Sequence, residues 1–259
     1  MNESLTLSLV LSMFVGLSSG YIGSLIVLKR MALVGDALSH VALPGFALGI
    51  LFNFNPFIGA FAFLFASAVL TWYIERVARL PAESIVGVLF VSALAIGILM
   101  IPQEGLREAL FGDITKITTL GVVLAITASV AVIYAMRVTY GKLVLVMISE
   151  ELAVSRGVDV AKINLVYLLL VSLVVAIGVS VVGTLLVGAL VVIPAVAAKV
   201  VSPNLSKYAL LSSVFGLISA SAGVISASYM NLPAGPLAIL SGLTLFVGCL
   251  AAKKFAIVK

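Results

Sequence analysis

Two ionisable residues in a long apolar stretch are the strongest candidates for chemistry. Asp36 is the only acidic residue inside any segment predicted to span a membrane, and His40 is the only histidine in the chain. The two residues lie four positions apart, so a helix presents both on one face. A carboxylate and an imidazole at this spacing can bind a transition-metal ion or relay protons. The structural alternative is a hydrogen bond between them that only fixes helix packing.

The depth of this pair in the membrane favours a function. At about 1.5 Å per residue from Arg30, Asp36 lies roughly 9 Å and His40 roughly 15 Å into a hydrocarbon core of about 30 Å. An acid at such depth costs at least about 2.5 kcal/mol on insertion scales, and such residues usually serve transport or proton relay. Two ligands hold a transition metal poorly. A two-fold dimer with this helix at its axis would supply four nitrogen and oxygen ligands, which suit zinc or, with water, manganese.

Pro44 and Gly45 follow this pair directly. Proline lacks the backbone donor and crowds the preceding turn, so we expect the helix to kink or break here. Broken helices beside a polar site occur in transporters, and a plain kink is the alternative.

The composition indicates that the elements carrying these residues span a membrane. Of 259 residues, 63% are hydrophobic and 10% are charged, whereas soluble domains carry about 25% charged residues. We predict an all-α fold: one transmembrane domain over residues 1–259, a polytopic bundle of about nine helices. Eight is the alternative count, because the stretch 163–201 is almost continuously apolar and is divided only at Gly183. The predicted ranges are 5–28, 31–53, 55–74, 84–101, 117–136, 163–181, 184–201, 206–229 and 234–252.

The basic residues predict the orientation. If the segment 137–162 is cytoplasmic and the helices alternate in direction, only Arg107 and Lys116 of the fifteen basic residues lie outside. The positive-inside rule therefore predicts a multi-pass protein of the plasma or inner membrane, with the N-terminus outside and the C-terminus in the cytoplasm. The basic residues placed inside are Lys29, Arg30, Arg76, Arg79, Arg137, Lys142, Arg156, Lys162, Lys199, Lys207, Lys253, Lys254 and Lys259.

The segment 137–162 is the longest polar part of the chain and is predicted to form the cytoplasmic contact. Ser149 is expected to cap a short helix with Glu150 and Glu151 in its first turn. Gly157 suits the end of that helix, directly after Arg156.

The segment 101–116 is predicted to lie outside. On exposure and charge alone, Glu104, Arg107 and Glu108 are candidate contacts for an external binding protein. A merely solvated loop is the alternative, since exposed charges are ordinary.

No enzymatic site is predicted. Gly16-Leu17-Ser18-Ser19-Gly20 matches a G-x-S-x-G nucleophile pattern, but it lies inside a predicted spanning helix rather than at a strand–turn–helix junction. Gly141-Lys142 lacks the preceding glycine of a phosphate-binding loop, so the chain is not expected to hydrolyse ATP alone. We predict no catalytic residue and no permanently bound cofactor.

Several segments together resemble the ABC-3 family, the zinc, manganese and iron importer permeases. Residues 30–45 (RMALVGDALSHVALPG) strongly resemble the hallmark of that family. Further similarities follow in order along nearly the whole chain, in residues 83–90 (ESIVGVLF), 110–114 (LFGDI), 187–195 (VGALVVIPA) and 232–236 (LPAGP).

The resemblance implies a permease of the type II ABC importer fold that works as a homodimer. It also implies two cytoplasmic ATPase subunits and an extracytoplasmic metal-binding protein as partners. The family's membrane metal site is attributed to the Asp and His of the hallmark, here Asp36 and His40. A helix at about 149–158 would couple to the ATPase, although Ser149-Glu150 stands where the family often has Asp-Pro.

We therefore predict the membrane-spanning subunit of an ABC importer for a divalent transition metal, driven by a separate ATPase. The transported ion would be zinc or manganese, with iron as a further candidate, because carboxylate favours manganese and imidazole favours zinc. A proton-coupled secondary metal transporter is the alternative function.

Overall fold

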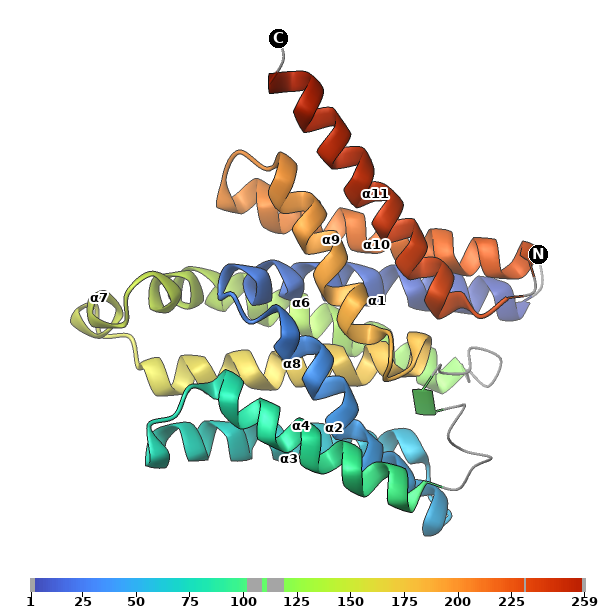
Figure 1. Cartoon of the computed structure of the whole chain (residues 1–259), viewed down its shortest axis with the longest axis horizontal. Coiled ribbons are helices and arrows are strands. Elements are labelled where there is room, and N and C mark those ends of the chain that lie inside the picture. The colour runs from blue at the N-terminus through green and yellow to red at the C-terminus, as the bar shows by residue number, and fades with distance from the viewer. Residues whose placement is uncertain (1–2, 102–108, 111–118, 231, 258–259) are drawn as a thin grey trace.

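The computed structural model describes residues 3–101, 109–110, 119–230 and 232–257. Every element assigned a range in these parts of the chain is a helix (Figure 1). The helices are α1 (Glu3–Leu28), α2 (Ala32–Leu51), α3 (Pro56–Ala78), α4 (Ala82–Met100), α6 (Thr119–Ile148), α7 (Glu150–Ser155), α8 (Val160–Val182), α9 (Val187–Val201), α10 (Leu205–Met230) and α11 (Ala234–Ile257).

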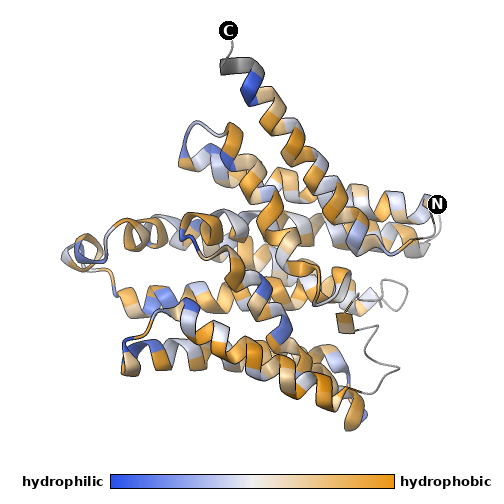
Figure 2. Ribbon diagram, viewed as in Figure 1, coloured by the Kyte–Doolittle hydropathy of each residue, from blue (hydrophilic) through white to orange (hydrophobic). Residues whose placement is uncertain are grey.

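The long helices run back and forth between two ends of the molecule (Figure 1). We call one the α7 end; it holds α7 and the connections α1–α2, α3–α4 and α9–α10. The other, the N-terminal end, holds the start of α1 and the connections α2–α3, α8–α9 and α10–α11. In Figure 2 the hydrophilic stretches gather at the α7 end, while the long helices are mainly apolar.

The predicted division at Gly183 is confirmed. Gly183 caps the C-terminus of α8 with φ 80°, a conformation that glycine adopts without a side-chain clash. Eight helices of the described chain are long and apolar enough to cross a membrane, whereas α9 has only 15 residues. Helix α9 still runs from the N-terminal end towards the α7 end (Figure 1), so the described helices pass nine times between the two ends.

The prediction that the span beginning near 117 ends at 136 is wrong. Helix α6 continues to Ile148 and has 30 residues, which corresponds to about 45 Å and exceeds the hydrocarbon core. The helix persists because its extension is packed: Leu143 and Val146 are buried, and Tyr140 stacks on Tyr21 of α1 with ring centroids 6.1 Å apart. The segment 137–162 is therefore mostly helix.

Helix α2 forms the centre of the bundle, where it packs against α3, α4, α8 and α9. Of the kink or break predicted at Pro44, the break does not occur, because α2 is one helix through this residue. Close packing supports it: a Cβ on Gly45 would lie 2.2 Å from the carbonyl oxygen of Gly59 on α3. Pro44 still removes one backbone donor, so the carbonyl of His40 lacks its usual helical partner.

Candidate metal site

Asp36 and His40 lie one turn apart on α2, as predicted. His40 is buried, with 8% of its surface exposed. Asp36 is half-buried. The prediction that Asp36 is the only acid within a span is wrong, because Glu75 lies near the end of α3 and Glu83 lies in the first turn of α4.

The imidazole of His40 has a ring nitrogen available for a ligand. Its ring lies against Phe90 of α4, with centroids 5.3 Å apart and planes inclined by 52°. Among the described residues, Nδ1 is buried and has no hydrogen-bond partner. A buried polar atom without a partner is rare and calls for an explanation, and a bound cation is one, because neutral imidazole is a common metal ligand.

The first turn of α9 touches Asp36. A Cβ built on Gly188 would lie 2.6 Å from Cα and Cβ of Asp36 and 2.7 Å from its Oδ1. Since Gly188 is the second residue of α9, the carboxylate lies beside backbone N–H groups at the positive end of the helix dipole. Sequence reasoning missed Gly188, although the residue lies within one of the quoted family segments.

A single copy of the chain offers few ligands. Within the described residues no group of three or more His, Cys, Asp and Glu side chains could hold a metal ion. Asp36 and His40 together supply one oxygen-bearing and one nitrogen-bearing group, which is fewer than the four protein ligands of a closed zinc site.

The residues predicted to form the cytoplasmic contact lie on and beside α7. Ser149 caps this helix as predicted, its hydroxyl oxygen accepting a bond of 3.2 Å from the backbone N–H of Leu152. Gly157 has φ 72°, which fits its predicted place at the helix end. The remaining predicted residues of this segment, Glu150, Glu151 and Arg156, are exposed.

Two apolar residues of α7 are also exposed, and sequence reasoning missed them. Leu152 is 53% and Val154 is 63% exposed. They flank the buried Ala153, so α7 presents both charged and apolar side chains on its outer surface.

Lys29 joins the α1–α2 connection to α8. Its Nζ lies 3.4 Å from Oδ1 of Asn164 and 4.7 Å from the ring centroid of Tyr167. Burial lowers the pKa of Lys29, and attraction to Glu75 and Glu150 opposes that shift. From the sequence this residue was used only as an indicator of orientation, because nothing local to position 29 predicts its contacts with α8.

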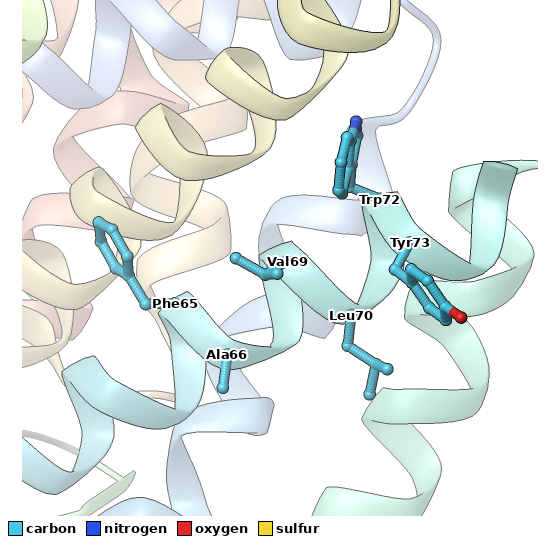
Figure 3. Close-up of a pocket in the computed structure, with 6 residues that line it drawn as sticks. All are labelled: Phe65, Ala66, Val69, Leu70, Trp72 and Tyr73. Carbon is cyan, nitrogen blue, oxygen red and sulfur yellow. The ribbon is translucent and has the colours of Figure 1, made fainter.

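The remaining candidates do not join these groups. Glu104, Arg107 and Glu108, the predicted external contacts, lie outside the described residues. A surface pocket on α3, drawn in Figure 3, contains neither Asp36 nor His40 and has no acidic or basic residue, which fits a surface that faces lipid. Its lining residues are Phe65, Ala66, Val69, Leu70, Trp72 and Tyr73.

Comparison with known sequences identifies the family. The ABC 3 transport family matches residues 1–253. The manganese transport system membrane protein MntC of Listeria innocua is 31% identical over 243 residues, which cover 92% of this chain and 87% of that protein. The high-affinity zinc uptake system membrane protein ZnuB of Buchnera aphidicola subsp. Baizongia pistaciae is 28% identical over 235 residues, covering 88% of this chain and 90% of that protein.

Comparison with solved structures agrees. A chain of PsaBC from Streptococcus pneumoniae, solved in complex with Fab, superposes with a TM-score of 0.84 at 28% identity and covers 96% of this chain and 91% of its own length. An inward-facing putative metal-chelate type ABC transporter has a TM-score of 0.75 at 20% identity over 95% of this chain and 85% of its own length, which supports the fold alone. The family predicted from the sequence is thus confirmed: the chain belongs to the ABC 3 transport family and is a membrane-spanning subunit of an ABC transporter.

Proposed function

We propose that this chain is the permease of an ABC importer that moves manganese or zinc into the cytoplasm. The observation that carries the proposal is the Asp36–His40 pair on the central helix α2, with a buried Nδ1 that has no partner among the described residues. The names of the relatives, a manganese system and a zinc system, support the same two metals. Iron(II) shares this ligand chemistry and is the third candidate.

The transported ion requires a second copy of the chain. Two copies related by a two-fold axis would place two carboxylates and two imidazoles around one ion. The structure leaves a suitable face open, because Leu33 on the same side of α2 is 73% exposed and Asp36 and Ala37 are only half-buried. We propose that this face of α2 meets its counterpart in a homodimer.

The energy for transport comes from ATP hydrolysed by a partner subunit. A cytoplasmic ATPase subunit binds each copy at α7, where exposed acidic and apolar side chains lie together. Lys29 transmits the movement of α7 to α2. It contacts α8, lies near Glu150 of α7, and precedes the first residue of α2 by three positions. ATP binding then tilts the two copies, so that the ion site becomes accessible from the other side of the membrane. An extracytoplasmic metal-binding protein delivers the ion at the N-terminal end.

The orientation and the coupling contact can be tested with one cysteine. In a Cys249→Ser background, Glu151→Cys is expected to react with a membrane-impermeant maleimide in inside-out vesicles but not in right-side-out ones, because α7 is cytoplasmic. Added ATPase subunit should lower the labelling rate of Glu151→Cys at least about tenfold, because it would cover this residue in the core of the interface.

A matched site controls for access. Lys254→Cys lies in the last turn of α11, where the side chain is exposed, and its labelling should not respond to the ATPase. Labelling of Glu151→Cys in right-side-out vesicles would contradict the proposed orientation. Labelling that is unchanged by the ATPase would contradict the proposed coupling contact at α7.

The function itself is tested by the energy source. Vesicles containing the permease and its ATPase, supplied with metal-loaded binding protein, are expected to accumulate manganese or zinc only with ATP inside the compartment that holds the ATPase. Collapse of the proton gradient should change the initial rate of metal uptake by less than about twofold. A tenfold change would correspond to about 1.4 kcal/mol. Uptake driven by a pH gradient without ATP would instead favour a proton-coupled transporter.

A further inference from the structure

A buried chain of hydrogen bonds links the backbone of Asp36 to Ala109. The hydroxyl of Ser39 lies 2.6 Å from the carbonyl oxygen of Asp36 and 2.6 Å from that of Thr184. The hydroxyl of Thr184 donates to the carbonyl oxygen of Ala109 at 2.9 Å. Ser39, Thr184 and Ala109 have no exposed surface.

The α8–α9 connection is the centre of this chain of bonds. The backbone N–H of Thr184 donates to the carbonyl of Ala109 at 3.1 Å, and that of Leu185 donates to the carbonyl of Leu110 at 3.1 Å. Ala109 and Leu110 are therefore attached by two backbone bonds and one side-chain bond. Both residues lie at the N-terminal end of the molecule, beside the α8–α9 connection.

The same connection leads directly into the helix that touches Asp36. Thr184 lies four residues before Gly188, whose Cα packs against Asp36. The Ser39 hydroxyl has one proton and two carbonyl acceptors within reach, those of Asp36 and Thr184. A bond to Asp36 stays within α2, whereas a bond to Thr184 ties α2 to the α8–α9 connection. In a buried setting, loss of a hydrogen bond leaves its partner unsatisfied, which makes the closed arrangement the favoured one.

We propose that Ser39 and Thr184 are positioning residues that act as one latch, holding Asp36 in place and tying the metal site to Ala109–Leu110. Displacement of Ala109–Leu110 at the N-terminal end pulls on Thr184, releases Ser39 and shifts Asp36. The latch thus opens the ion site towards the side from which the ion enters. This inference rests on the proposed function of Asp36 and His40.

The test is a double-mutant cycle on the complete transporter, with Mn²⁺ uptake per assembled complex as the first readout. Ser39→Ala removes the donor to Thr184, and Thr184→Val removes the donor to Ala109 with little change of shape. Each is expected to lower uptake about tenfold, and the double variant should also lie near tenfold rather than one hundredfold, because members of one network are not additive. Thr184→Ser, which keeps the hydroxyl, should restore uptake to within about twofold of wild type.

Ser12→Ala is the matched control. Ser12 is fully buried and, like Ser39, donates to the carbonyl three residues before it, that of Leu9, at 2.9 Å. The control should leave uptake unchanged. Affinity of the permease–ATPase complex for Mn²⁺ is the second readout, and it should weaken in Ser39→Ala but not in Ser12→Ala.

The latch is overturned if the two single effects multiply, if Thr184→Ser is as impaired as Thr184→Val, or if Ser39→Ala behaves like Ser12→Ala. Asp36→Ala, measured alongside, separates this failure from failure of the proposed function. If Asp36→Ala loses uptake while Ser39→Ala and Thr184→Val transport normally, only the latch is overturned. If Asp36→Ala itself transports normally, the assignment of the metal site is overturned.

Discussion

Metal uptake is expected to fall by more than about 100-fold when Asp36 or His40 is replaced by alanine. Loss of a residue that only orients a metal ligand already costs about 10- to 100-fold in affinity or activity. In a two-fold site each substitution removes two ligands at once, one from each copy. Uptake of Mn²⁺ or Zn²⁺ by vesicles containing the complete transporter measures the effect, with binding of the ATPase and dimer assembly checked for each variant.

Ser67→Ala serves as the control for these substitutions. Ser67 is buried in α3, and its hydroxyl donates to the carbonyl of Leu64 in its own helix. It should therefore transport at close to the wild-type rate. A correctly assembled Asp36→Ala or His40→Ala variant that transports as well as Ser67→Ala would reduce the pair to a packing contact.

The second large effect is expected for Gly188→Ala. The added Cβ would lie 2.6 Å from Cα and Cβ of Asp36, so α2 and α9 must separate or the carboxylate must move. Overpacking of this kind costs about 1–3 kcal/mol of stability, and displacement of a reacting group by about 1 Å can cost about 100-fold in rate. Both thermal stability of the assembled transporter and metal uptake should fall.

Gly248→Ala on α11 separates this clash from the general effect of replacing glycine in a membrane helix. Nothing lies within 4 Å of a Cβ at Gly248, so its stability and uptake should match the wild type. Equal behaviour of the two variants would show that α9 does not constrain Asp36.

Features that depend on local sequence could be predicted. The apolar runs located the nine helices of 15 or more residues in the described parts of the chain, because long apolar segments are typical of helices that cross a hydrocarbon core. Ser149 and Gly157 marked the ends of α7 because capping and positive φ are requirements of single residues. The Asp36–His40 pair was visible because charge is rare in apolar segments and the helical period fixes which residues share a face.

Features that depend on contacts between distant segments could not be predicted in this way. Helix α6 runs past its basic residues because Tyr140 packs on Tyr21, more than one hundred positions earlier. A kink or break was expected at Pro44, and α2 is unbroken there because Gly59 lets α3 pack closely against it. The burial of Lys29 arises in the same way, since a hydropathy pattern carries no information about which helices become neighbours.

Metal content of the purified permease–ATPase complex tests the central claim most directly. The wild-type complex, equilibrated with Mn²⁺ in lipid nanodiscs and freed of unbound metal, is predicted to hold one ion per two copies of this chain. The double variant Asp36→Ala/His40→Ala, assembled with the same ATPase, is predicted to hold none. One ion per two copies in the double variant, bound with unchanged affinity, would contradict the assignment of Asp36 and His40 as the ligands of the transported ion.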